Sequence, residues 1–195
     1  YPTKQITTGE GGMLITNNKK FYNKIKTLKA FGIDKDINQR KKQGTYDVVS
    51  LGFNYRLTDF QSALGLRQIQ NYKNNLKKRH LLAKNYIYNL KNVKEVNCMP
   101  YSQNCSFFVF QIFCKNRDKL LKRFKDKKIG VSIHYATPLP SMSYYKNKYN
   151  FKKINFKNAK NYADTNISLP VYPSLTNQEL NKVVKVIKEF YGYRK

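Results

Sequence analysis

The residues of this chain that could carry chemistry begin with a lysine close to its start. Lys4 follows Tyr1-Pro2-Thr3 and precedes Thr7-Thr8 and the glycine-rich run Gly9-Glu10-Gly11-Gly12. The neutral amine of a lysine is a nucleophile that can form a Schiff base with a carbonyl compound. Glycines at this density mark backbone that turns sharply or lies close to another group. Taken alone, the pattern fits a surface lysine before a tight turn better than it fits a nucleophile.

Three further polar residues precede a predicted helix. Asn54, Tyr55 and Arg56 come just before Thr58, whose side chain can cap the N-terminus of the helix that follows. Side chains at such an entrance can reach a ligand, and an arginine there can hold a phosphate through two hydrogen bonds. The same residues can instead satisfy backbone groups or form surface ion pairs. Both interpretations stay open at this point.

A histidine follows an apolar run in the second half of the chain. His134 comes directly after Val131-Ser132-Ile133 and opens a segment bounded by Pro138 and Pro140. A histidine here is more often a hydrogen-bonded structural residue than a catalytic one, although histidine is well suited to both roles. His134 is therefore a candidate ligand contact of lower rank than Lys4.

The length and the net charge of the chain limit which domain arrangements and functions are possible. The 195 residues, 41% of them hydrophobic, are enough for one large domain or two small ones with a real core. A net charge of +27 permits a module that binds nucleic acid or another polyanion. The lysines are scattered along nearly every segment rather than gathered on one helix, which favours a solvated basic surface.

The cysteines and the hydropathy of the chain bear on its cellular compartment and on whether it crosses a membrane. The three cysteines, Cys98, Cys105 and Cys114, show no CxxC spacing and share the chain with only two histidines, so we expect neither a disulfide framework nor a metal site. This favours a reducing, cytoplasmic compartment. No apolar run approaches the roughly 18 to 20 residues that cross a bilayer, so we expect no membrane span.

Periodicity predicts elements that would position these residues. Strands are expected at residues 11–16, 93–96, 106–113 and 131–133, and helices at 19–31, 58–91, 117–128 and 156–165, with a last helix capped by Thr176 and Glu179. Residues 33–52 lack apolar periodicity and are expected to form an extended loop. The long helix would bridge two domains, and the alternation of strands and helices after it predicts a small α/β domain.

Four segments together resemble a known family, the pyridoxal-phosphate-dependent sugar aminotransferases of the DegT/DnrJ/StrS type. They are the Lys4 segment with its glycines, residues 52–66, His134-Tyr135 and Ser168-Leu169-Pro170. Each motif is weak alone, but their order and spacing match over essentially the whole chain. The resemblance implies the α/β fold of the fold type I transferases. Residues 1–73 would be the C-terminal part of the large cofactor-binding domain, and residues 74–195 the small C-terminal domain with its bridging helix.

The resemblance also implies roles for the site residues. Lys4 would carry pyridoxal 5'-phosphate covalently, as a Schiff base, and later act as a general base. Asn54 would contact the cofactor phosphate of a neighbouring subunit, so the working site would need a homodimer. Tyr55, Arg56 and His134 would contact a nucleotide-sugar substrate. Pro140 stands where many relatives have a histidine, which puts a substrate role of that position in doubt.

The implied activity is transfer of an amino group, from glutamate, to a nucleotide-linked keto-sugar for surface polysaccharide or glycan synthesis. Some relatives with histidine at the Lys4 position are dehydratases, so the lysine favours transamination. The acidic partner of the pyridine nitrogen and the main phosphate-binding loop would lie before Tyr1. We therefore expect a fragment that does not hold the cofactor alone. We expect neither a nucleic-acid partner nor a membrane partner. Two alternatives are a basic module that binds polyanions and a stand-alone interaction fragment.

Overall fold

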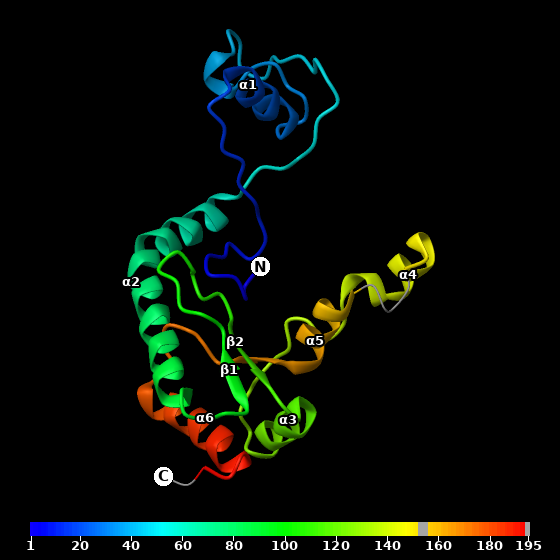
Figure 1. The fold of residues 1–195 in the computed structure, drawn as a ribbon. Coiled ribbons are helices and arrows are strands. Elements are labelled where there is room, and N and C mark those ends of the chain that lie inside the picture. Colours follow the sequence, from blue (N-terminus) through cyan, green and yellow to red (C-terminus); the bar gives the residue numbers. More distant parts are fainter. Residues whose placement is uncertain (152–155, 194–195) are drawn as a thin grey trace. The chain divides into compact units, whose positions relative to one another are not determined.

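The computed structural model describes residues 1–151 and 156–193 and divides the chain into two units (Figure 1). The N-terminal unit is Tyr1–Tyr72 and the C-terminal unit is Lys73–Lys195. The elements follow in the order α1 (Lys19–Leu28), η1 (Ile37–Gln39), α2 (Asp59–Leu90), β1 (Val96–Cys98), β2 (Phe110–Cys114), α3 (Arg117–Asp126), η2 (Leu139–Ser141), α4 (Ser143–Tyr149), α5 (Lys157–Thr165), β3 (Asn166–Leu169) and α6 (Asn177–Phe190). Assigning residues 1–73 to a larger domain and residues 74–195 to a small one stays a prediction.

Helix α1 forms where the sequence predicts it but ends three residues early. Its N-terminus is capped by Asn18, whose side chain accepts a hydrogen bond from the Phe21 N–H. After Leu28 the backbone turns into the left-handed region at Phe31 and Gly32, and the Gly32 N–H donates to the Thr27 carbonyl at 3.0 Å. A glycine at this place ends a helix at little conformational cost.

The predicted strand at residues 11–16 is wrong. The segment has no strand assignment, and Met13 and Ile15 are 85% and 88% exposed. The apolar run has the composition of a buried strand, but no strand or isolated bridge among the described residues pairs with it. A strand is defined by its partner, so composition alone could not produce one here.

The expected loop at residues 33–52 is present and its base is closed by backbone contacts. Ile33 and Val48 form an isolated antiparallel bridge, and the Phe31 N–H donates to the Phe53 carbonyl at 3.0 Å. The short helix η1 lies inside the loop. The two ends of the loop therefore lie next to each other, at the end of α1.

Helix α2 confirms the prediction of a long helix. It runs for 32 residues and passes from the N-terminal unit, where it begins, into the C-terminal unit. Charged residues recur along it, and none of the helices in the described ranges has the length and apolar character needed to cross a membrane.

The C-terminal unit is built on a three-stranded antiparallel sheet in the order β1-β2-β3. Val96 of β1 pairs with Cys114 of β2, and Phe110 of β2 pairs with Leu169 of β3. Residues 131–133, predicted as a strand, reach only an isolated bridge, in which Ser132 and Ser168 exchange both backbone hydrogen bonds. This bridge places the end of that segment beside β3.

Two predicted strands are displaced for local backbone reasons. The strand expected at residues 93–96 begins only at Val96, because Val93 and Val96 form successive turns after α2, with Val93 N–H donating to the Leu90 carbonyl. The strand expected at residues 106–113 begins only at Phe110, because Phe107 has a φ of 46°, outside the extended region.

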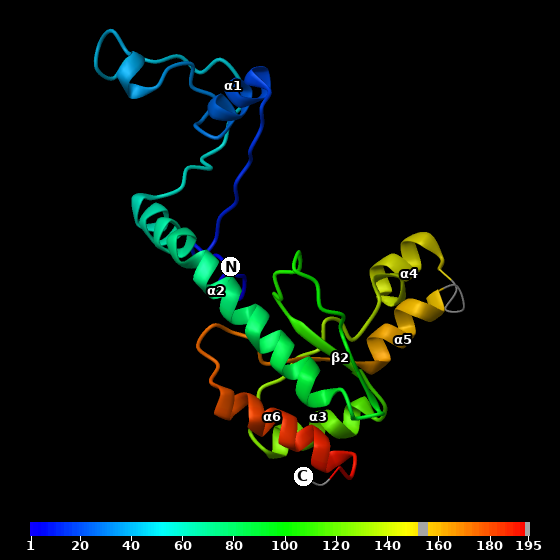
Figure 2. The ribbon, with the colours of Figure 1, turned by 60° about the vertical axis from the view of Figure 1, so that its left-hand side comes forward.

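The core of the C-terminal unit lies between this sheet and three helices (Figure 2). On α2, the Tyr86 ring stacks on Phe110 of β2 with centroids 5.1 Å apart, and its hydroxyl donates to the Pro170 carbonyl. Burial raises the pKa of the Tyr86 hydroxyl. Helices α3 and α6 pack against each other and contribute Phe124 and Ile187, both fully buried.

The last helix confirms its predicted start. Thr176 caps α6, accepting from the Glu179 N–H at 3.2 Å, while the Glu179 carboxylate accepts from the Thr176 N–H at 2.8 Å. This reciprocal pair satisfies two backbone donors that a helix end leaves unpaired.

Candidate functional site

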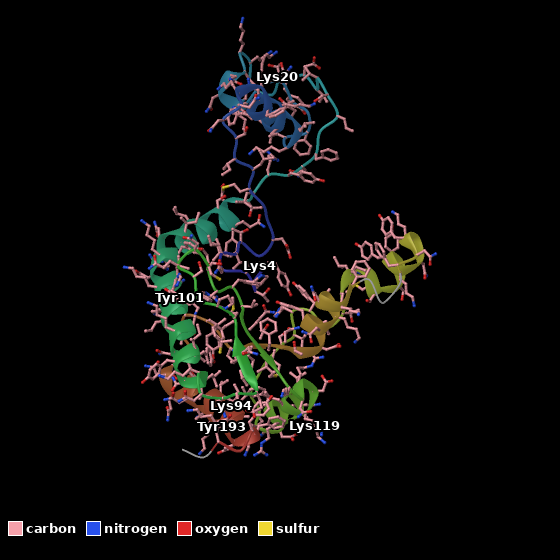
Figure 3. All side chains as sticks on the ribbon, in the orientation of Figure 1. Lys4, Lys20, Lys94, Tyr101, Lys119 and Tyr193 are labelled. Atoms are coloured by element: carbon pink, nitrogen blue, oxygen red, sulfur yellow. The ribbon has the colours of Figure 1, made fainter. Side chains whose placement is uncertain are left out.

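Lys4 lies on an exposed turn at the start of the N-terminal unit (Figure 3). The turn is closed by the Lys4 N–H, which donates to the Tyr1 carbonyl at 3.2 Å. Downstream, the Gly9 N–H donates to the Thr7 hydroxyl and the backbone at Gly9 has a φ of 83°. The predicted sharp turn beside the lysine is therefore present.

The Lys4 segment is held against the first half of α2. The Gln61 side chain donates to the Glu10 carbonyl at 3.1 Å. Gly65 is buried, and a Cβ added there would lie 3.0 Å from the Thr8 methyl group. The small residue thus permits the close approach of the Lys4 segment to this face of the helix.

Asn54, Tyr55 and Arg56 lie together beside the end of α1. Asn54 forms an isolated bridge with Ala30, and the Arg56 Nε donates to the Asn54 Oδ1 at 3.4 Å. The Arg56 guanidinium lies 5.1 Å from the centre of the Phe31 ring, within cation–π range. All three candidate residues are exposed. The structure therefore brings Asn54 and Arg56 into contact with each other, in the same unit as Lys4.

A cleft of about 1400 Å³ opens in the N-terminal unit. Two of the candidate residues, Tyr55 and Arg56, are among its lining residues, as are Glu10, Gly11 and Gly12 of the glycine-rich run. The lining also includes cations and aromatic rings, together with two acidic residues: Lys26, Lys29, Lys35, Arg40, Tyr22, Phe31, Asp34 and Asp36. Such a lining suits a ligand with phosphate groups and a flat ring.

Two cleft residues have their charge fixed by specific partners. Lys26 pairs with Asp36, whose side-chain hydrogen bond raises the pKa of the lysine. Asp34 accepts from the backbone N–H of Asp47 at 3.0 Å, which lowers the pKa of that carboxyl group. By contrast, the Arg40 Nε is buried and has no hydrogen-bond partner among the described residues. Arg40 is thus a cleft cation with unused donor capacity.

His134 lies in the C-terminal unit, half-buried, at the end of the segment that bridges to β3. Its Nδ1 lies 2.8 Å from the Ser168 hydroxyl, and its backbone N–H donates to the Asn166 side chain at 3.1 Å. The Gln111 side-chain amide donates to the His134 carbonyl at 2.8 Å. These contacts support the structural interpretation of His134 and leave its ring partly exposed.

Sequence reasoning missed the residues that hold His134. Asn166, Gln111 and Ser168 are all buried, on β3 and β2, and none has a local signal that marks it as a partner of a histidine. Only Ser168 lay inside a motif singled out from the sequence, Ser168-Leu169-Pro170. Lys26 and Arg40 of the cleft were missed too, because lysine and arginine are common throughout this chain.

Comparison with known proteins identifies relatives at moderate identity. The chain is 31% identical over 200 residues to the uncharacterized protein MJ1066 of Methanocaldococcus jannaschii, covering 97% of this chain and 52% of that protein. It is 31% identical over 198 residues to the UDP-4-amino-4,6-dideoxy-N-acetyl-beta-L-altrosamine transaminase of Campylobacter jejuni, covering 97% of this chain and 49% of the relative. The chain thus spans about half the length of the curated relatives it matches.

Solved structures show the same relationship at the level of the fold. The chain is similar to PseC of Helicobacter pylori, an aminotransferase involved in the biosynthesis of pseudoaminic acid, with a TM-score of 0.83 and 25% identity over 96% of this chain and 50% of that one. It is also similar to the putative sugar aminotransferase Spr1654 of Streptococcus pneumoniae, with a TM-score of 0.81 and 20% identity over 96% and 50% of the two chains. The predicted fold class is therefore confirmed.

The family assignment rests on the sequence itself. The sequence model of the DegT/DnrJ/EryC1/StrS aminotransferase family matches residues 1–188, which include the Lys4 turn, Asn54 to Arg56, His134 and Ser168. The family resemblance predicted from four short motifs is thereby confirmed, and the chain belongs to the DegT/DnrJ/EryC1/StrS aminotransferase family.

Proposed function

We propose that the chain contributes the cofactor lysine and part of the substrate site to an enzyme that transfers an amino group to a nucleotide-linked keto-sugar. The observation that carries the proposal is the family match over residues 1–188, with Lys4 inside the matched range on an exposed turn. Because the chain spans about half the length of its relatives, the activity belongs to a protein that also holds the other half of the fold.

The residues present fit the attachment of pyridoxal 5'-phosphate. Lys4 is exposed on its turn, and the backbone downstream of it is anchored to α2 through Glu10 and Gln61. An anchored turn limits the movement of the amine once the cofactor is attached. When bound, the cofactor withdraws electrons from the substrate carbon and so makes a proton on that carbon removable.

Two roles then fall to residues of this chain. Lys4 Nζ would hold the cofactor and would accept and return the proton of the substrate carbon. Asn54 contacts the cofactor phosphate of a neighbouring subunit, with its side chain oriented by the Arg56 Nε at 3.4 Å. The role of Asn54 makes the working unit a homodimer. The homodimer, glutamate as amino donor and a cytoplasmic location all rest on the family resemblance.

The cleft of the N-terminal unit supports a nucleotide-linked substrate. Arg56 and Arg40 supply charged donors for phosphate oxygens, and Tyr55 supplies a ring at the same cleft. Nucleotide sugars combine a diphosphate with a flat base, so this lining matches both parts. The Campylobacter jejuni relative is named for a UDP-linked amino sugar, which makes synthesis of surface polysaccharide or glycan the proposed context.

The proposal is tested by measuring transamination in the protein that joins this chain to the rest of the family fold. With glutamate and a UDP-linked keto-sugar as substrates, Lys4→Ala is expected to lower the rate by roughly 100- to 10,000-fold, the usual range for loss of a proton-transferring group. Lys20→Ala, which removes an exposed lysine of α1, serves as the matched control. Equal activity of the two variants would overturn the assignment of Lys4.

A further inference from the structure

The Ser168 hydroxyl has one described partner, the His134 ring. Ser168 is 5% exposed, and its Oγ lies 2.8 Å from His134 Nδ1. No other hydrogen bond of this hydroxyl occurs within the described residues. On the other side of the ring, Nε2 likewise has no hydrogen-bond partner in the described part of the chain. The two ring nitrogens are therefore in different situations: one faces a buried hydroxyl and the other is available.

This pairing decides which ring nitrogen carries the proton. If Nδ1 carried it, Nδ1–H would donate to Oγ, and the buried hydroxyl hydrogen would be left with no acceptor. An unpaired buried polar group costs about 1–3 kcal/mol. If Nδ1 is unprotonated, the Ser168 hydroxyl donates to it, and both the buried hydroxyl and Nδ1 are satisfied. The neutral ring then carries its proton on Nε2.

The backbone of His134 is held from two sides by buried amides. The Asn166 side chain is fully buried and accepts from the His134 N–H, while its own amide donates to the Tyr162 carbonyl at 2.8 Å. The Gln111 side chain donates to the His134 carbonyl, and its oxygen accepts from the Tyr162 hydroxyl at 2.5 Å. Each amide is thus oriented by a second bond, and the position of His134 is fixed by β2, β3 and α5.

We infer that Ser168 is a positioning residue that fixes His134 as its Nε2–H tautomer, so that His134 presents a hydrogen-bond donor rather than a base. The inference rests on the proposed function for its consequence: a ligand that contacts the His134 ring would do so through an acceptor oxygen, such as that of a phosphate or a sugar. Asn166 and Gln111 hold the backbone of His134 in place, and Ser168 of the Ser168-Leu169-Pro170 motif orients its ring.

The chain is well suited to a direct test because His80 and His134 are its only histidines. Long-range proton–nitrogen NMR of the ¹⁵N-labelled 195-residue chain shows which nitrogen of each ring is protonated. The spectrum is recorded in mildly alkaline buffer. A His80→Gln variant assigns the two patterns. For His134 we expect Nε2–H with no detectable Nδ1–H form.

Ser168→Ala removes the hydroxyl donor, so we expect the two ¹⁵N shifts of His134 to move toward each other as the Nδ1–H form becomes populated. The matched control is Ser132→Ala, the same substitution at the bridge partner of Ser168, whose described contacts are through the backbone. It should leave the shifts unchanged, and the His80 pattern reports whether the fold is intact.

Nδ1–H in the wild-type chain, or identical His134 shifts in wild type and Ser168→Ala, would overturn the inference. The wild-type spectrum decides the question even if the Ser168→Ala variant does not fold. The spectrum is also independent of catalysis. If a His134→Asn variant kept full transamination in the complete enzyme, His134 would have no substrate role, while the tautomer seen in the wild-type spectrum would still stand. Failure of the substrate role and failure of the tautomer assignment are therefore distinguishable.

Discussion

Gly52 and Gly32 cross with their backbones in direct contact. A Cβ on Gly52 would lie 1.9 Å from the Gly32 nitrogen, and a Cβ on Gly32 would lie 1.8 Å from the Ser50 carbonyl oxygen. Gly32 also has a φ of 75°, which disfavours any residue with a side chain. The crossing closes the base of the 33–52 loop and brings Asn54 beside the end of α1.

Gly52→Ala is therefore expected to disrupt the N-terminal unit, because a methyl group has no room against backbone atoms. Overpacking typically costs about 1–3 kcal/mol, and a clash with backbone leaves little freedom to relax. Hydrogen exchange of the Phe31 and Phe53 amides, which are bonded across this crossing, measures the loss. Gly12→Ala is the control, since a Cβ there meets nothing within 4 Å. Equal exchange in the two variants would contradict the prediction.

The capping pair of α6 gives the C-terminal unit a defined pH dependence. Backbone and side-chain hydrogen bonds from Thr176 lower the pKa of Glu179 in the folded state. A lowered folded pKa stabilises the fold above the unfolded value of about 4.3, and this stabilisation is lost as the pH falls through the folded pKa. We expect Glu179→Gln to lower stability at neutral pH and to flatten its decline in acid.

Urea unfolding at neutral and acidic pH measures this effect. Glu189→Gln makes the same charge change on the same helix, where Glu189 forms exposed ion pairs with Lys185 and Arg123. Exposed pairs contribute little to stability. If the two variants lost stability in parallel across the pH range, the capping bonds of Glu179 would not be the cause.

The helices other than α4 could be predicted from the sequence because their signals are local. The capping pair of Thr176 and Glu179 lies within one turn of α6, and the end of α1 is marked by Gly32. Strands depend on partners that the local sequence does not contain. Residues 11–16 have strand composition without a partner among the described residues, and Phe107 shortens β2 through one left-handed backbone angle.

Site residues that lie within one sequence motif could be predicted, and those that the fold brings together from distant positions could not. Lys4, Asn54 and Arg56 stood out through their neighbours in sequence. The pair of His134 and Ser168 is separated by 34 positions, and it forms only because the Ser132 bridge places that segment against β3. Arg40 is an ordinary arginine in a basic chain, and only its buried Nε in the cleft lining distinguishes it.

The 195-residue chain alone is expected not to retain pyridoxal 5'-phosphate. It spans about half the length of its relatives, and the family resemblance assigns the acidic partner of the pyridine nitrogen to the other half. Titration of the chain with the cofactor, followed by absorbance in the Schiff-base band, tests this. A saturable band that disappears in Lys4→Ala but persists in Lys20→Ala would show that the chain is sufficient.

The net charge of +27 is expected to produce only non-specific attraction to nucleic acid. Such binding has dissociation constants of roughly 10⁻⁴ to 10⁻⁶ M at physiological salt and weakens steeply as salt rises. Fluorescence anisotropy with labelled duplex DNA and single-stranded RNA, at several salt concentrations, measures it. Saturable binding well below this range at physiological salt would favour the polyanion-binding alternative.

Locating the covalent attachment of pyridoxal 5'-phosphate tests whether Lys4 is the cofactor lysine. The protein that joins this chain to the rest of the family fold is loaded with pyridoxal 5'-phosphate, reduced with borohydride, digested and analysed by mass spectrometry. We expect a stable adduct on Lys4, none on the exposed control Lys20, and no stoichiometric adduct in Lys4→Ala. An adduct on a different lysine, or a stoichiometric adduct that survives Lys4→Ala, would contradict this assignment.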